Sequence, residues 1–226
     1  LVVSEGLQRL YADRDHRTLY LPNGIDLPDP HPPSRIESEL GLRGEDYLLF
    51  LGRWAGEKRV LELIEAFSEL RCRGLKLVVA GTAEPETSHG RKTHRLASST
   101  PGVILPGTVE GKLKEELLSN AFAFVSFSEV EGMPMALLEA MSHERPCLVS
   151  DIPAHRELLN GGRGLLRDVT TPRSRVDALR DLVSLSPTER RRMGRRARED
   201  LHPTHDWDRL VDELERLYAE VAGGTG

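Results

Sequence analysis

Residues 47–58 read Tyr-Leu-Leu-Phe-Leu-Gly-Arg-Trp-Ala-Gly-Glu-Lys, and this stretch decides the fold. An apolar run ends at Gly52, and a loop then leads into an amphipathic segment. Such a run is typical of a parallel strand that is buried on both faces of its sheet. From Glu57 to Arg71 apolar residues recur at helical spacing, so we expect a helix there.

The same pattern of strand and helix recurs along the chain. Apolar runs predict four further strands, at 75–80, 103–105, 122–125 and 147–149. Helical spacing predicts helices at 134–142, 174–183, 187–200 and 206–221, and the proline-rich stretch 28–33 predicts a loop. Alternating strands and helices with short connections predict an α/β fold with a doubly wound parallel sheet. Ligands of such sheets bind beyond the carboxyl ends of the strands, so the residues that follow each strand are the first candidates.

Composition narrows the class of protein. The chain has 226 residues, enough for one α/β domain with appendages or for two small domains. Its 31 basic and 36 acidic residues give a net charge of -5, which weighs against a nucleic-acid partner. We expect the two cysteines, Cys72 and Cys147, to be reduced, buried thiols of a cytoplasmic protein. No apolar run reaches the roughly 20 residues that span a bilayer, and no signal peptide is visible.

Several familiar motifs are absent from the sequence. No GxGxxG follows the first strand, which weighs against an NAD-dependent dehydrogenase. No Walker A lysine supports a P-loop NTPase, and no GxSxG supports a hydrolase. The eight histidines show no metal-ligand spacing, so we predict no bound metal.

The loop after the first strand is the first candidate site. Arg53 and Lys58 are cations close to the expected amino end of a helix, where the helix dipole disfavours them. A bound anion such as a diphosphate would make both favourable. The alternative is that both are solvated, with Lys58 paired to Glu57 or Glu62.

The second candidate is the segment 128–141, Ser-Glu-Val-Glu-Gly-Met-Pro-Met-Ala-Leu-Leu-Glu-Ala-Met. Pro134 suits the first turn of a helix, and Gly132 allows a ligand to approach the backbone. Glu139 lies in a helix that is apolar almost all round, so its carboxylate needs donors. The two hydroxyls of a ribose would supply them, and the alternative is a structural pairing with an arginine or a backbone N–H. Glu131 would contact a sugar beside the diphosphate, or else it is a solvated loop carboxylate.

Two weaker signals lie further along. Residues 151–157 place polar groups after the strand at 147–149, which alone predicts little. Six arginines lie between residues 190 and 198. A solvated helical face explains them best, and peripheral contact with anionic lipid at the inner face of a membrane is the alternative.

Taken in order, these segments resemble the second lobe of the retaining glycosyltransferase family 4, of the two-lobed GT-B architecture with Rossmann-like lobes. The most specific match is the Glu-x7-Glu motif, here Glu131 to Glu139 in EGMPMALLE. GRWAGEK resembles the Gly-Arg…Glu-Lys segment of the family, and LYLPNGIDL resembles its Pro-Asn-Gly turn. LVVAGT, LPGTV and SDIPAHRELL also follow in the family's order.

The resemblance implies roles for the matched residues. Arg53 and Lys58 would hold the donor diphosphate, Glu131 would contact the sugar near its reacting carbon, and Glu139 would bind ribose. The loop from Gly107 to Val109 would cover the base. The catalytic residues implied are Glu131, Arg53 and Lys58, and the donor site comprises Gly52, Arg53, Lys58, Gly81, Thr82, Gly107, Val109, Ser128, Glu131, Gly132, Met133, Pro134, Glu139 and Glu157.

The sequence departs from the family at several points. Gly81 leads into Thr82-Ala83-Glu84-Pro85 in place of a glycine-rich turn, and Phe127-Ser128 stands where Pro-Ser is frequent. Both departures concern how the base and sugar edges are recognised. Only residues 1–18 precede the segment that begins the second lobe, and we interpret them as a remnant of the inter-lobe segment.

The resemblance also implies a division of the chain and its partners. Residues 19–186 would form the nucleotide-sugar-binding domain, and residues 187–226 would form helices that pack back toward a missing first lobe. That lobe would bind a carbohydrate, lipid or other hydroxyl acceptor. We expect an exposed apolar stripe on the last helix, through which a dimer would form.

The function implied is that of the donor-binding half of a retaining glycosyltransferase. It would need no cofactor, would use a nucleoside diphosphate sugar, with UDP or GDP expected, and would be inactive without the acceptor lobe. The alternatives are a sugar-nucleotide epimerase of the same architecture and a non-catalytic nucleotide-sugar-binding module.

Overall fold

A six-stranded parallel sheet forms the centre of the computed structural model, which describes residues 1–12, 18–82 and 87–223. The strands lie in the order β3-β2-β1-β4-β5-β6. They are β1 (Tyr47–Leu51), β2 (Lys76–Ala80), β3 (Val103–Gly107), β4 (Ala123–Ser126), β5 (Cys147–Ser150) and β6 (Leu165–Arg167). The order reverses between β1 and β4, which is the switch point where a doubly wound sheet binds its ligand. The predicted fold class is confirmed.

The five strands predicted from apolar runs are present within two residues of their expected ends. β1 pairs with β2 over its full length, from Tyr47 opposite Lys76 to Leu51 opposite Ala80. The sixth strand was not predicted. It has three residues, all partly buried, and so gives too short an apolar run to stand out in the sequence.

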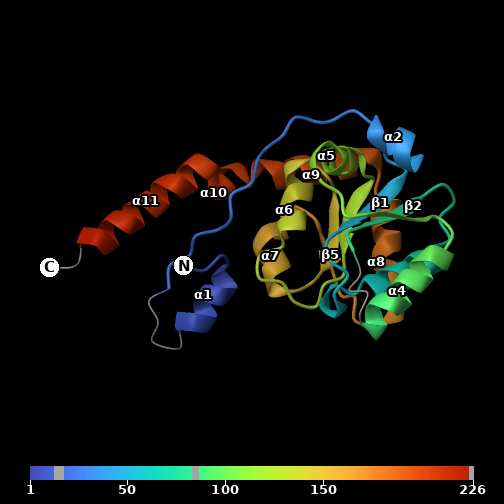
Figure 1. Ribbon diagram of the computed structural model, residues 1–226, viewed down its shortest axis with the longest axis horizontal. Coiled ribbons are helices and arrows are strands. Elements are labelled where there is room, and N and C mark those ends of the chain that lie inside the picture. Colours follow the sequence, from blue (N-terminus) through green and yellow to red (C-terminus); the bar gives the residue numbers. More distant parts are fainter. Residues whose placement is uncertain (13–17, 83–86, 224–226) are drawn as a thin grey trace.

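Helices cover both faces of the sheet (Figure 1). One face packs against α2 (Arg35–Leu40), α5 (Gly111–Asn120), α6 (Met135–Ser142), α7 (Pro153–Leu159) and α9 (Pro187–Glu199). The other packs against α3 (Val60–Leu70), α4 (Ser88–Ser99) and α8 (Pro172–Ser184). Figure 1 shows α6 and α7 on one side of β5 and α8 on the other. Because both faces are covered, the strands can be apolar throughout. Cys147, in β5, is buried as predicted, but the prediction was wrong for Cys72, which lies just beyond the end of α3 and is exposed.

Both of the predicted helices that follow a candidate site loop begin later than expected. The helix expected from Glu57 is a 3-10 turn, η1 (Gly56–Lys58), followed by α3 from Val60. Arg59 separates them because its φ of 49° is left-handed and cannot continue a right-handed helix. Likewise α6 begins at Met135, so Pro134 occupies the position before the helix and not its first turn.

Glycine is required where β1 and β2 end. Gly81 has a φ of +120°, and a Cβ there would overlap the carbonyl oxygen of Gly52. The two strand ends therefore approach more closely than a side chain would allow. The N–H of Gly81 donates to the carbonyl of Gly107 at 2.7 Å, which extends the pairing of β2 with β3 into the loops.

A buried carboxylate fixes the start of α2. Oε2 of Glu116, on α5, accepts hydrogen bonds from the backbone N–H groups of Ser34, Arg35 and Ile36 at 2.9, 2.6 and 3.1 Å. Burial opposes ionisation of this carboxyl, but the three donors hold the pKa of Glu116 below its ordinary value.

The first and last helices of the chain lie at the α7 end of the molecule (Figure 1). The first helix, α1 (Glu5–Ala12), contacts α7, whereas α10 (His202–His205) leads into α11 (Trp207–Gly223), which extends away from the sheet (Figure 1). Trp207, Val211 and Tyr218 are exposed, which confirms the predicted apolar stripe, but Leu210 is 5% exposed and packs inward. Among the described helices, none combines the length and apolar character needed to cross a bilayer.

Candidate functional site

A cavity of about 460 Å³ lies at the carboxyl ends of β1, β2 and β4, at the switch point of the sheet. It brings together most of the predicted site residues, although they come from four separate segments of the sequence. These are Gly52, Arg53, Lys58, Gly81, Thr82, Val109, Glu131, Met133, Pro134 and Glu139.

An ion pair in the lining of the cavity joins the first two candidate segments. The ammonium of Lys58 donates to both carboxylate oxygens of Glu131, at 2.6 and 2.7 Å. The side chains of Lys58 and Glu131 are 22% and 11% exposed, so the pair is only partly screened by water. Lys58 is thus paired neither with Glu57 nor with Glu62, and Glu131 is not a solvated loop carboxylate.

The two loops that carry this pair are also joined through their neighbours. The N–H of Glu129 donates to the carbonyl of Glu57 at 2.8 Å, and the guanidinium of Arg59 pairs with the Glu129 carboxylate. The left-handed Arg59 is therefore held in place by the loop after β4. These contacts fix Lys58 and Glu131 on one rigid wall of the cavity.

The amino end of α6 also lines the cavity. Met135, Ala136 and Leu137 line the cavity there, and the first N–H groups of a helix carry a partial positive charge. Arg53 and Lys58 line the same cavity, so cationic groups and a helix amino end converge on it. Such an arrangement favours an anionic ligand.

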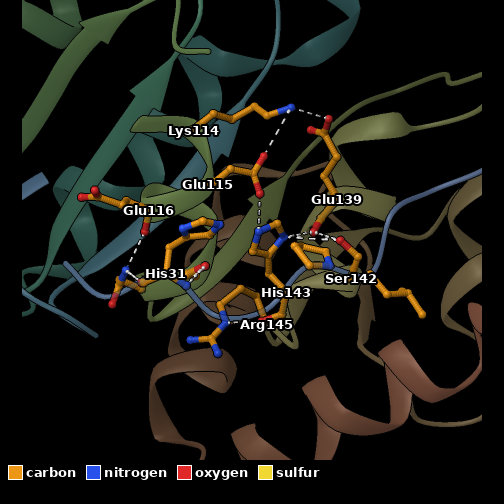
Figure 2. A network of polar contacts seen from close by, with 12 residues as sticks. His31, Lys114, Glu115, Glu116, Glu139, Ser142, His143 and Arg145 are labelled. Atoms are coloured by element: carbon orange, nitrogen blue, oxygen red, sulfur yellow. Dashed lines mark hydrogen bonds and ion pairs between the residues drawn. The ribbon is translucent and has the colours of Figure 1, made fainter. Parts of the chain in front are cut away.

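Glu139 lies further along the same cavity, and its donor is a lysine. Its side chain is 24% exposed, so it is less buried than the apolar helix predicted, and its Oε1 accepts from Lys114 of α5 at 2.9 Å. Figure 2 shows Lys114 reaching toward Glu139 above a second contact, in which His143 Nε2 lies 2.8 Å from Glu115. His143 Nδ1 lies 2.9 Å from the carbonyl oxygen of Glu139, so the network supports the backbone beneath the carboxylate.

His155 is a cavity residue that the sequence analysis did not single out. Its ring is fully buried, and Nδ1 lies 2.8 Å from the carbonyl oxygen of Ser150. Burial lowers the pKa of His155 below its ordinary value of 6.5, against the opposing effects of the Ser150 hydrogen bond and the charge of Glu131. Its place within 151–157, directly after β5, was the only signal in the sequence. Lys114 was missed as well, because nothing in the sequence of α5 marks it.

Four predicted site residues do not line this cavity. Ser128 is buried and lines a second cavity of about 380 Å³ near the ends of β5 and β6. Glu157 accepts from the N–H of Glu5 at 2.6 Å and lines a third, of about 260 Å³. The carbonyl of Gly107 accepts a hydrogen bond from the N–H of Gly81, and Gly132 is exposed in the loop before α6. Whether these four contact a ligand stays a prediction.

The chain matches the family model described as "Glycosyl transferases group 1" over residues 35–200. It is 27% identical over 224 residues to an alpha-D-kanosaminyltransferase from Streptomyces kanamyceticus, covering 94% of this chain and 56% of that protein. Over 221 residues it is 24% identical to spore coat protein SA from Bacillus subtilis, covering 89% and 58%. The chain thus spans little more than half the length of these curated relatives.

Solved structures confirm the fold. Sucrose-phosphate synthase from Thermosynechococcus elongatus superposes with a TM-score of 0.84 at 20% identity, over 99% of this chain and 58% of that one. Anabaena Alr3699/HepE, solved in complex with UDP and glucose, superposes with a TM-score of 0.84 at 16% identity, over 97% and 62%. The chain has the Rossmann-like lobe of a GT-B protein, as predicted.

Proposed function

The chain belongs to the family of glycosyl transferases group 1, and from this premise we propose that it is the donor-binding lobe of a retaining glycosyltransferase. The donor would be a nucleoside diphosphate sugar held in the cavity at the switch point. HepE, a protein of the same fold, was solved with UDP and glucose, which supports a UDP-sugar as the first donor to test. We also propose that the chain belongs to glycosyltransferase family 4.

The convergence of Arg53, Lys58 and the amino end of α6 on one cavity carries this proposal. A diphosphate brings negative charge that these groups would stabilise, and the partly buried setting strengthens the interaction. Lys58 is now held by Glu131, so the diphosphate would share its ammonium or take it over. No divalent metal is required in this scheme, because the cations are supplied by side chains.

The transfer step follows from where charge develops. As the bond from the anomeric carbon to the diphosphate breaks, charge gathers on the diphosphate oxygens, where Arg53 and Lys58 would stabilise it. The acceptor hydroxyl would attack from the same face of the sugar, so the anomeric configuration is retained. Glu131 would orient the sugar beside the breaking bond.

The nucleoside would occupy the end of the cavity near α5. The carboxylate of Glu139 offers two oxygens, which suit the adjacent hydroxyls of a ribose. Val109, after β3, would contact the base from the side. Lys114 would remain beside Glu139 and keep its charge balanced.

The remaining partners are proposals that rest on the family. We propose that a separate lobe binds the acceptor, that α11 packs against that lobe, and that this chain alone transfers no sugar. The exposed residues of α11 would also allow a dimer to form. We propose a cytoplasmic protein, with the arginine-rich α9 as the element that would contact the inner face of a membrane.

Calorimetric titration of the chain with UDP, GDP, ADP and NAD tests the proposal. We expect one nucleoside diphosphate to bind, which would also identify the base. Binding of NAD alone, or of none of the four, would contradict a donor site. Assay of a longer protein that includes an acceptor lobe would separate transfer from epimerisation, because an epimerised sugar formed without acceptor excludes a transferase.

A further inference from the structure

His155 lines the cavity and has one ring nitrogen without a hydrogen-bond partner among the described residues. Nε2 of His155 is buried and, within the part of the chain that the structure describes, forms no hydrogen bond. The ring itself is 0% exposed, and it lines the cavity that also contains Lys58 and Glu131. A buried polar atom without a partner is unfavourable, so a ligand that supplies the missing hydrogen bond would bind more tightly.

The other ring nitrogen determines what Nε2 can bind. Nδ1 faces the carbonyl oxygen of Ser150 at 2.8 Å, and a carbonyl can only accept, so Nδ1 carries the proton. The neutral ring then has a lone pair at Nε2. Burial favours this neutral form by lowering the pKa of His155.

Because Nε2 is an acceptor, it can bind only those parts of a nucleotide sugar that donate a hydrogen bond. Diphosphate oxygens are acceptors at neutral pH and offer nothing to Nε2, whereas sugar hydroxyls are donors. His155 also shares the cavity wall with Glu131, the residue proposed to orient the sugar. We therefore propose that Nε2 of His155 accepts a hydrogen bond from a hydroxyl of the transferred sugar, so that His155 is a sugar-specificity residue. This inference rests on the proposed donor site.

The change His155→Phe tests the contact, because the ring is kept and the acceptor is removed. Affinities for UDP and UDP-glucose, and for GDP and GDP-mannose, are measured by calorimetry in wild type and variant. The ratio of the two Kd values in each pair reports the affinity that the sugar adds. In wild type the sugar should add affinity in one pair, and we expect that gain to fall about three- to tenfold in the variant.

His205→Phe is the matched control. His205 is also buried and also faces a backbone carbonyl through Nδ1, that of Asn23 at 2.8 Å, but it lies outside the cavity. The gain from the sugar should be unchanged in this variant. An equal fall in both variants would mean that loss of a buried histidine, and not of a sugar contact, explains the effect.

A spectroscopic measurement on the wild type covers the case in which His155→Phe does not fold. In protein labelled with ¹⁵N-histidine, the Nε2 resonance of His155 should shift on addition of the nucleotide sugar but not of the nucleotide alone. An unmoved resonance, or a sugar gain that is unchanged in His155→Phe or absent from wild type, would overturn this inference while leaving nucleotide binding intact. Failure of UDP, GDP and ADP alike to bind would instead reject the donor site itself.

Discussion

The ammonium of Lys58 lies 2.6 and 2.7 Å from the two carboxylate oxygens of Glu131 and so joins loops that are 73 residues apart in the sequence. Both residues are proposed to act on the donor, Lys58 on the diphosphate and Glu131 on the sugar. A bound diphosphate would draw on the same ammonium that Glu131 now holds. Release of Glu131 toward the sugar would then follow from binding of the diphosphate.

Substitution at the two ends of this ion pair should therefore have opposite consequences. Lys58→Gln removes the cation, and we expect UDP or GDP to bind about 10- to 100-fold more weakly, the range for loss of a hydrogen bond to a charged group. Glu131→Gln leaves the ammonium free for the diphosphate, so the affinity for the nucleotide should stay equal or rise. Calorimetric titration of both variants gives the comparison.

Lys76→Gln is the control for this pair of variants. Lys76 also forms an ion pair, with Asp46 at 3.0 Å, but it lies at the amino end of β2, at the other edge of the sheet. Its loss should leave nucleotide affinity unchanged. Nucleotide binding by Lys58→Gln at the wild-type affinity would remove Lys58 from the site.

Glu139 should recognise ribose, and the sugar of the nucleotide offers a direct test. Wild type should bind UDP or GDP more tightly than the 2′-deoxy form, because one donor to the carboxylate is lost. In Glu139→Ala this preference should disappear, with nucleotide affinity reduced by about 1–3 kcal/mol. Calorimetric titration of wild type and of Glu139→Ala, each with the ribose nucleotide and with its 2′-deoxy form, gives the four affinities of this cycle.

Glu144→Ala serves as the control in that cycle, since Glu144 lies just beyond α6 and outside the cavity. It should keep the wild-type preference for ribose. If Glu139→Ala still preferred the ribose nucleotide, the ribose hydroxyls would bind to a residue other than Glu139.

The doubly wound parallel sheet could be predicted from the sequence because the longer strands form nearly continuous apolar runs. Five such runs, with segments of helical spacing after the runs at 47–51 and 122–125, favour a doubly wound sheet, although the helices α4, α5 and α7 that follow the other three runs were not predicted. The three-residue β6 carried too little pattern to be seen, and the left-handed Arg59 could not be expected from a basic residue within a helical spacing. Local backbone breaks of this kind depend on contacts such as that of Arg59 with Glu129, which lies far along the chain.

The sequence was enough to predict which loops form the site, but not all of the side chains that line it. Residues that directly follow β1, β2 and β3 line the cavity as expected, because parallel strands end at one edge of the sheet. Lys114 reaches the cavity from the side of α5, and His155 from within α7, and neither position follows from strand order. The pairing of Lys58 with Glu131 also required coordinates, since Glu57 and Glu62 lie closer in sequence.

Gly81→Ala should destabilise the fold, since the new Cβ would overlap the carbonyl oxygen of Gly52 and the φ of +120° is strained for alanine. We expect a loss of about 2–4 kcal/mol in the free energy of unfolding, measured by urea denaturation. Gly56→Ala is the matched control, because a Cβ at Gly56 would meet no atom within 4 Å and the φ of Gly56 is not positive. It should change stability by less than about 0.5 kcal/mol. Equal stability of the two variants would show that the ends of β1 and β2 can separate at little cost.

Glu116 should make the stability of the fold depend on pH in the acid range. Its folded-state pKa lies below the ordinary value of 4.5, because three backbone N–H groups outweigh the effect of burial. The stabilisation is therefore complete above about pH 4.5 to 5 and is lost as the pH falls through the lower, folded-state pKa. Glu116→Gln cannot ionise, so it should be less stable than wild type by about 1.5–3 kcal/mol at pH 7, and the difference should narrow on acidification. Urea denaturation between pH 3 and 7 measures the stability of both proteins. Glu110→Gln is the control that should follow wild type, because Glu110 is an exposed residue at the start of α5. A difference between wild type and Glu116→Gln that stays constant down to pH 3 would mean that folding does not lower the pKa of Glu116, and would contradict this prediction.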